Sequence, residues 1–188
     1  RSSFRTRASD GRGPARTSQT LRMATHEREI TEPVRLCLPD GRTLDPAARG
    51  WSRLPLHDAN LTGGWGRTKR WDYWAILAGD LVIAVTYADV DYLGMATVWW
   101  FDMTTGASGG VDANVPFARG LDLPDRYGTA PLRYSDRRIE IEIAYAEAGT
   151  TIDATWKEKD GRASHLWAEI DLPPGHESLH VVIPWSDR

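Results

Sequence analysis

Apolar and polar side chains alternate along most of the chain after Trp71. The runs Trp71–Leu77, Leu81–Ala88 and Leu93–Met103 are rich in β-branched and aromatic residues, and short polar turns separate them. In the clearest run, Arg138–Ala146, apolar side chains alternate with two glutamates. A period of two is that of a β-strand with one buried face, whereas an amphipathic helix repeats every 3.6 residues. The pattern therefore predicts consecutive antiparallel strands.

The alternation resumes at Ile152–Trp156 and Leu166–Leu172, on either side of the turn Lys159-Asp160-Gly161. Residues 107–137 contain Gly109-Gly110 and three prolines and show no sustained period, so we assign them no element. Short turns and the lack of a long amphipathic helix favour an all-β fold. We expect a closed antiparallel barrel of about eight to ten strands, because closure removes unpaired sheet edges and leaves room for a small ligand.

The segment before Trp71 is less regular. Val34–Leu38 and Arg42–Leu44 flank Pro39-Asp40-Gly41, which predicts a small hairpin. Asp45–Gly50 has the residues of one helical turn, with an acidic N-cap, a proline at the first position and a closing glycine. The stretch from Trp51 to about Arg70 is predicted to be a long loop, a kind of segment that is often functional.

Composition narrows the class of protein. The 188 residues include a single cysteine, Cys37, which excludes an intramolecular disulfide and favours a reducing, cytoplasmic compartment. No apolar run approaches the roughly 18 residues of a membrane span, so we expect none. No motif calls for a cofactor, and we expect none.

Charge separates the first residues from the rest. Residues 1–22 carry six arginines and one acid, or +5, which leaves −8 on residues 23–188. We predict that 1–29 is a disordered or spurious extension, since it has too few apolar side chains to fold. An acidic body without a basic stripe argues against a nucleic-acid partner. We expect the barrel to span 30–172, and 173–188 to be a linker and the first strand of a truncated second domain.

Nine tryptophans are the most informative feature of the composition. Aromatic side chains line many ligand cavities, and Trp71, Trp74, Trp99 and Trp100 are candidate walls of a cavity for an apolar small molecule. The same residues at period two can equally fill a solid core, and the sequence leaves both interpretations open.

Polar candidates lie close to these tryptophans. On a strand, Arg70, Asp72 and Trp74 share one face, where Arg70 and Asp72 can pair as an anchor at the mouth of a cavity. His57 and Asn60 in the preceding loop are further candidates for the same place. An ordinary ion pair at a strand start is the alternative.

Asp89 and Asp91 are two apart, so on an extended segment their carboxylates point to one side and can share a proton or hold a cation. With Tyr92 and His57 they are the candidate catalytic groups for protonating a double bond and orienting water. The alternative is a polar strand end that leads into a turn.

The segment His176-Glu177-Ser178-Leu179-His180 spells the zinc-protease motif HExxH, which needs a helix to bring both imidazoles to one metal. Prolines precede the segment and β-branched residues follow it, so we assign no metal site. We expect a turn that enters a strand, and we include His176 and Glu177 among the candidate ligand-binding residues.

Several motifs together resemble the DUF2804 family over roughly residues 30–185. They are Ile30-Thr31-Glu32-Pro33, Gly50-Trp51-Ser52, Pro55-Leu56-His57, Lys69-Arg70-Trp71-Asp72-Tyr73-Trp74, Ala88-Asp89-Val90-Asp91-Tyr92-Leu93-Gly94 and Pro174-Gly175-His176-Glu177-Ser178-Leu179. The resemblance implies a longer protein with two lipocalin-like barrel halves, similar to the AttH and carotenoid-hydratase group, of which this chain holds the first. The family pattern has asparagine where this chain has His180, so the resemblance lends no support to a zinc site.

The resemblance implies no established activity. Binding of an apolar or lipid-like molecule in a barrel cavity is the first hypothesis. A hydratase or isomerase acting on an isoprenoid or other unsaturated lipid is the second, and a partner-binding module is the third.

Overall fold

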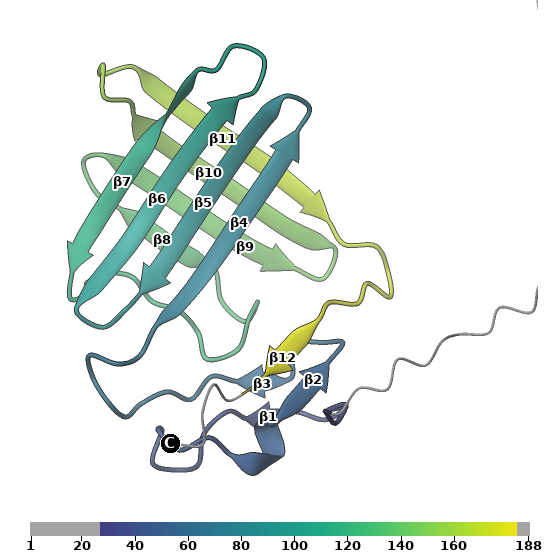
Figure 1. Ribbon diagram of the computed structural model, residues 1–188. Coiled ribbons are helices and arrows are strands. Elements are labelled where there is room, and N and C mark those ends of the chain that lie inside the picture. The colour runs from purple at the N-terminus through teal and green to yellow at the C-terminus, as the bar shows by residue number, and fades with distance from the viewer. Residues whose placement is uncertain (1–26, 184–188) are drawn as a thin grey trace, which may run out of the picture.

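The alternating segments form two four-stranded antiparallel sheets in the computed structural model, which describes residues 27–183. The first sheet has the order β4 (Arg70–Ala78), β5 (Leu81–Asp89), β6 (Leu93–Asp102) and β7 (Ser108–Pro116). The second has the order β8 (Leu132–Ser135), β9 (Ile139–Ala146), β10 (Gly149–Lys157) and β11 (Ala163–Asp171). The two sheets face one another, and their strands cross at an angle (Figure 1).

The predicted all-β antiparallel fold is confirmed. The strand pairing does not close the sheets into the predicted barrel. Within residues 27–183, β7 pairs with β6 alone and β8 pairs with β9 alone. The connection between them, 117–131, is rich in glycine and proline instead of being a tight hairpin turn, and it carries the chain from one sheet to the other. The fold is therefore a pair of stacked sheets that keep their edges.

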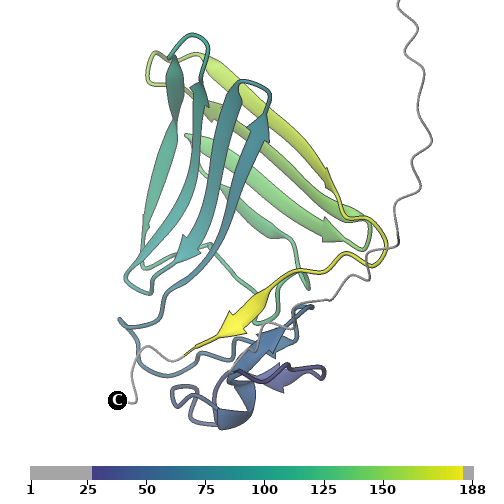
Figure 2. The ribbon, with the colours of Figure 1, turned by 45° about the vertical axis from the view of Figure 1, so that its right-hand side comes forward.

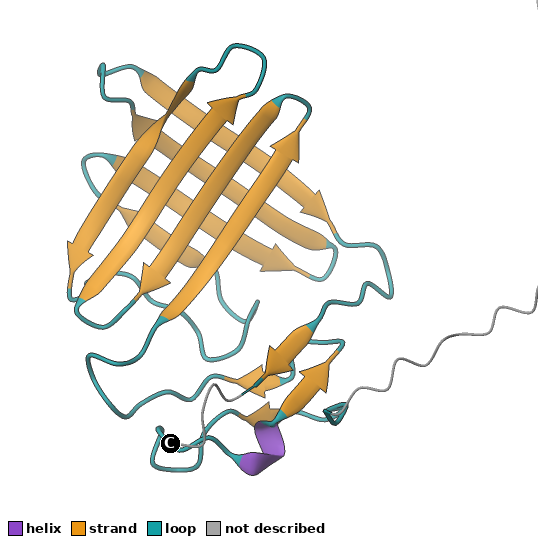
Figure 3. Cartoon of the chain, in the orientation of Figure 1, coloured by secondary structure: helices purple, strands orange, loops and turns teal. Residues whose placement is uncertain are grey.

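Below the sandwich lies a group of short elements (Figures 1 and 3). β1 (Val34–Arg35) pairs in parallel with β3 (His57–Asp58), and β2 (Gly50–Ser52) pairs with β12 (His180–Val182). The 3-10 helix η1 (Pro46–Ala48) begins where Asp45 accepts a hydrogen bond from Ala47 N at 2.8 Å, as the capping pattern predicts. The predicted loop 51–70 therefore contains part of β2 and all of β3.

The ends of the described chain meet in this group. Glu29 forms a bridge with Trp51, and β12 returns from the sandwich to pair with β2. The predicted linker and first strand of a second domain thus lie, as far as the structure describes them, against β2. The predicted extension 1–29 falls mostly outside the described residues, as does 184–188. No helix in the described part of the chain is long and apolar enough to cross a membrane.

The core lies between the two sheets, where the inward positions of the strands are mostly apolar. Each fully buried aliphatic side chain contributes about 1.5–3 kcal/mol relative to exposure. The largest fully buried side chains of this core are Val85, Tyr87, Val98, Leu132, Ile139, Ile141, Ile143 and Ile152. Side chains therefore fill the space that a barrel cavity was expected to occupy.

The outer faces of the two sheets differ in polarity. The strand register shows that the outward positions of β4, β5 and β6 carry no charged side chain, and Trp71, Tyr73 and Leu77 are 57–75% exposed there. The outward positions of the other sheet carry charged groups, among them Glu140, Asp153, His165 and Glu169. The first sheet thus presents an apolar face to solvent, and the second presents a polar, charged face.

A buried carboxylate joins the two sheets at one end of the sandwich. Glu158, 7% exposed, accepts hydrogen bonds from the indole N–H groups of Trp100 and Trp156, both at 2.9 Å. It also accepts from Gly110 N at 2.8 Å and Ser164 Oγ at 3.0 Å. The donors come from β6, β7, β10 and β11, so one carboxylate holds two strands of each sheet.

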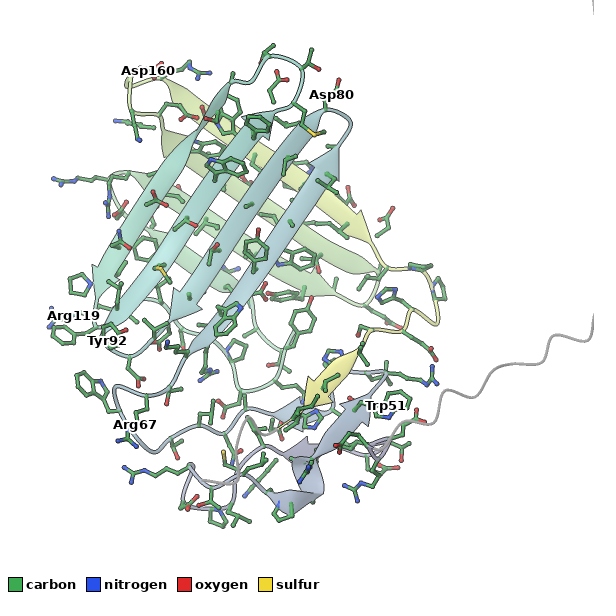
Figure 4. All side chains as sticks on the ribbon, in the orientation of Figure 1. Trp51, Arg67, Asp80, Tyr92, Arg119 and Asp160 are labelled. Carbon is green, nitrogen blue, oxygen red and sulfur yellow. The ribbon has the colours of Figure 1, made fainter. Side chains whose placement is uncertain are left out.

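The hydrogen bonds keep Glu158 ionised. Burial opposes ionisation, but the four donors outweigh it and lower the pKa from 4.5 to about 2. Figure 2 shows the sheets approaching one another at the end that holds Asp160, which Figure 4 labels, and spreading toward the end that faces β2 and β12. The two sheets therefore form a wedge, and the Glu158 carboxylate links them at its narrow end.

Glu158→Gln is expected to lower the free energy of unfolding by about 3 kcal/mol, because the new amide group faces buried donors. Urea unfolding measures the loss. Since the folded-state pKa of Glu158 is depressed, its contribution to stability is fully present above pH 4.5 and is lost as the pH falls toward about 2. The difference between wild type and variant should shrink over that range.

Glu140→Gln is the matched control, because Glu140 is exposed on the outer face of β9. It should stay within about 0.5 kcal/mol of wild type. Equal effects of the two substitutions, or a difference that does not change with pH, would contradict the role assigned to Glu158.

Candidate functional site

A pocket of about 390 Å³ opens at the spread end of the sandwich. Its walls come from β3, the start of β4, the loop 123–128 and the ends of β8 and β9. The lining residues are Leu36, His57, Ala59, Leu61, Lys69, Arg70, Trp71, Asp72, Leu123, Pro124, Asp125, Tyr127, Gly128, Leu132 and Tyr145. Four of the candidates from the sequence, His57, Arg70, Trp71 and Asp72, therefore meet in one place.

Asp72 and Tyr145 form the polar centre of this pocket. Asp72 faces inward from β4, and the Tyr145 hydroxyl donates a short hydrogen bond to its carboxyl from β9 in the opposite sheet. The ring of Tyr127 packs edge-on against Tyr145, with 4.9 Å between the ring centroids. The two sheets thus contribute one partner each to a carboxyl–phenol pair.

The surroundings favour the neutral form of both groups. Burial raises the pKa of Asp72, and the hydrogen bond from Tyr145 offsets only part of that effect. Burial also raises the pKa of Tyr145 beyond its ordinary range, and the nearby carboxyl raises it further. The buried Trp74 indole N–H has no partner with hydrogen-bond geometry, although its proximity lowers the pKa of Asp72 slightly. A carboxyl group with this environment keeps its proton at a higher pH than an exposed one does.

Arg70 serves the loop instead of pairing with Asp72. Its guanidinium donates to the carbonyls of Leu123 and Pro124, the latter at 2.7 Å, and lies 3.5 Å from the Asp125 carboxylate. Arg70 therefore pairs with the loop and not, as had been expected, with Asp72. Both side chains do face inward, as the alternation predicts. Two acceptors on a turning loop match the fork of a guanidinium better than a neighbour on the same strand.

His57 lies at the wall that the short elements contribute. Its Nε2 is 2.9 Å from the carbonyl oxygen of Ala48 and so carries the proton, which leaves Nδ1 as an acceptor. His180 is close by: burial lowers its pKa, and repulsion from His57, when that ring is protonated, lowers it further. His180 Nε2 shares a 2.6 Å hydrogen bond with Ser178 Oγ.

The three remaining catalytic candidates lie away from this pocket, in the turn between β5 and β6. Asp89 accepts a hydrogen bond from Asp91 N at 2.8 Å, and Asp91 accepts from Gly66 N and Thr68 N at 2.6 and 3.0 Å. Tyr92 is exposed. The two carboxylates therefore hold separate backbone groups instead of sharing a proton, since this turn reverses the chain after Asp89 and leaves Asp91 with a positive φ.

The tryptophans divide between the two faces of their sheet. Trp74 and Trp100 point inward, whereas Trp71 and Trp99 are exposed, and Trp99 stacks on Phe101. Asn60 exchanges two hydrogen bonds with the backbone of Cys37, at 2.8 and 2.9 Å. Of the four tryptophans, only Trp71 lines the pocket described here.

The HExxH segment forms a turn and the start of β12, as expected. His176 is exposed, and its backbone N–H donates to Pro173 O at 2.9 Å. Glu177 forms an ion pair with Arg53 at 2.7 Å. Neither side chain lines the pocket, and residues 27–183 contain no group of three metal-ligating side chains.

The sequence pattern does not reveal Tyr127, Tyr145 or the loop around Leu123 as parts of a site. Tyr145 shares the apolar face of β9, and nothing in one sequence says that its hydroxyl meets a carboxyl from β4. Tyr127 and Leu123 lie in the connection without periodicity. Only the composition of that connection, with prolines and large side chains, could have marked it as more than a linker.

The model of the family described as a domain of unknown function, DUF2804, matches residues 27–188. The chain belongs to the DUF2804 family. The resemblance drawn from the motifs is thereby confirmed, and it includes the two segments, 55–57 and 69–74, that contribute His57 and Asp72 to the pocket. Neither the curated proteins nor the solved structures contain a match to this DUF2804 chain.

Tyr145→Phe is expected to raise the pKa of Asp72, which already lies above its ordinary 3.8, because the substitution removes a donor that favours the carboxylate. Carboxyl carbon chemical shifts followed through a pH titration measure this value. Since the folded-state pKa is raised, ionising Asp72 costs stability as pH rises through it.

Tyr127→Phe is the control, since it removes a hydroxyl from the same pocket without removing a hydrogen bond to Asp72. It should leave the Asp72 titration in place. Identical titrations in all three proteins would contradict the coupling of Asp72 to Tyr145.

Proposed function

We propose that this chain binds a small molecule with an apolar body and a polar end, and that the pocket lined by His57, Asp72 and Tyr145 is its site. The proposal is supported by the make-up of the walls: five aliphatic side chains surround a few convergent polar groups. Ligand sites of about 300–1,000 Å³ commonly have this composition, in which apolar walls supply affinity and polar groups fix orientation.

The site lies at the end of the sandwich instead of inside it. Ile143 and Leu132 occupy the space between the sheets, and Leu132 forms the floor on which a ligand would rest. A lipocalin-like relationship remains part of the proposal, since two facing antiparallel sheets that spread toward one end have the outline of an incompletely closed barrel.

Ala59→Phe is expected to weaken ligand retention by about tenfold or more, about 1.4 kcal/mol, because a phenyl ring fills the pocket from the β3 side. Native mass spectrometry with solvent extraction measures the fraction of protein that carries a ligand. Addition of a fatty acid such as oleic acid provides a defined probe.

Ala75→Phe is the matched control, the same change at an outward position of β4. It should retain ligand as wild type does. A wild-type protein that binds neither an endogenous molecule nor the probe would overturn the proposal, as would equal retention by the two variants.

A second candidate function, hydration or isomerisation of an unsaturated lipid, is favoured by the raised pKa of Asp72 in this pocket. A protonated carboxyl next to an apolar cavity can donate its proton to a carbon–carbon double bond. In hydration, water then adds its hydroxyl to the cation and returns its other proton to Asp72. In isomerisation, the cation instead loses a neighbouring proton to the carboxylate. His57 Nδ1 is an acceptor able to orient the water.

Asp72→Asn is expected to abolish turnover while binding persists, because the amide accepts the Tyr145 hydrogen bond but has no acidic proton. Oleic acid and geranylgeraniol incubated with protein in deuterated water report the step by deuterium gained at carbon. The Asp91→Asn variant is the control and should match wild type. Deuterium gained equally by the Asp72→Asn variant would contradict this role, and a wild type that incorporates none would leave binding as the function.

A further inference from the structure

Three loops meet at one corner of the molecule and expose aromatic side chains there. Trp65 precedes β4, Tyr92 lies in the turn between β5 and β6, and Phe117 follows β7; they are 71%, 52% and 57% exposed. Phe117 N donates to Tyr92 O at 3.0 Å, and Asp91 binds the amides of Gly66 and Thr68. Arg67, Tyr92 and Arg119 are labelled together at this corner in Figure 4. These hydrogen bonds make the three loops one surface.

The backbone of this corner is strained. Within residues 27–183, the non-glycine residues with a positive φ are Asp91 at 68°, Phe117 at 58° and Ala118 at 48°, and all three lie here. The left-handed region is unfavourable for residues with a Cβ and persists where the surroundings enforce it, often at functional sites. Ala118 is buried over Gly94, where an added Cβ would come within 2.7 Å of Ala118 Cα. The fold therefore fixes a conformation that leaves Phe117 in solvent.

Basic side chains surround these aromatic rings. Arg67 and Lys69 flank the first loop, and Arg119 places its guanidinium 5.6 Å from the centre of the Phe117 ring. Among the described residues, none of the three forms an ion pair with an acid. The Asp91 carboxylate is turned onto the loop amides. The corner thus offers free positive charge on a chain whose residues 23–188 are otherwise acidic.

We propose that this corner, defined by Trp65, Tyr92, Phe117, Arg67, Lys69 and Arg119, docks the protein on an anionic lipid surface. Tryptophan and tyrosine favour the boundary between water and hydrocarbon because an apolar ring carries a polar group. Unpaired arginine and lysine beside them are attracted to acidic headgroups. Charge complementarity selects this partner, because the unpaired positive charges lie beside the exposed aromatic rings.

The corner adjoins the candidate ligand site. Trp65, Lys69 and Trp71 line one groove beside the first loop, and Lys69 and Trp71 also line the pocket that contains Asp72. A lipid surface at this corner would therefore lie at the mouth of the pocket. Docking on lipid goes beyond the proposed binding function and does not depend on it, since vesicle binding and ligand retention are separate measurements.

Co-sedimentation with vesicles tests the proposal. The protein is expected to sediment with vesicles of equal parts phosphatidylcholine and phosphatidylserine, and not with vesicles of phosphatidylcholine alone. Added salt should release it, because screening weakens the attraction of exposed charges to the headgroups.

Two variants separate the charged and the apolar contributions. Arg67→Gln with Arg119→Gln should lower the affinity about fivefold for each charge removed. Phe117→Asn should lower it by roughly tenfold, since an aromatic side chain no longer leaves water. Asparagine tolerates a positive φ, so this variant should unfold at the same urea concentration as wild type or a higher one.

Trp167→Ala is the matched control, because Trp167 is 59% exposed on β11, in the other sheet. It should bind vesicles as wild type does. Wild-type protein that ignores anionic vesicles, or corner variants that bind them undiminished, would overturn the proposal.

Discussion

The buried carboxylate of Glu158 is the constraint on which the arrangement of the two sheets depends. A charge removed from water must be surrounded by donors, and those donors come from two strands of each sheet. Any shift of one sheet against the other would leave the carboxylate without part of its solvation. The narrow end of the wedge is therefore fixed, and the freedom to differ lies at the other end.

That other end is where the chemistry gathers. Asp72 and Tyr145 approach from opposite sheets, and the loop held by Arg70 covers them. The carboxyl of Asp72 accepts a hydrogen bond from one phenol, and burial raises its pKa, whereas Glu158 accepts from four donors, which lower its pKa to about 2. The pKa values of these two acids therefore shift in opposite directions, because burial outweighs the donors around Asp72 and the donors around Glu158 outweigh its burial.

Period-two alternation predicted β4, β5, β6, β9, β10 and β11 well, because each strand has one buried and one exposed face. It failed at β8 and at β7, where two glycines interrupt the pattern: Gly109 leaves room for Trp100 and Glu158, and Gly110 lies against the backbone of Val98. The pocket was half predicted: Asp72 and His57 lie in motifs, whereas Tyr145 meets Asp72 only through packing of the two sheets. The prediction that Asp89 and Asp91 point to one side failed, because their spacing suits a shared proton only on a continuing strand. The strand ends at Asp89.

The contrast between the two outer faces gives the particle a directionality at a larger scale than any single element. An amphipathic helix separates oil from water across its width of about 10 Å, and here two layers about 10 Å apart do so across the whole sandwich. The positions around Tyr73 face one way, and those around Asp153 face the other. At a boundary between apolar and aqueous phases, the face around Tyr73 is favoured on the apolar side and the face around Asp153 on the aqueous side. The protein therefore has one preferred orientation there.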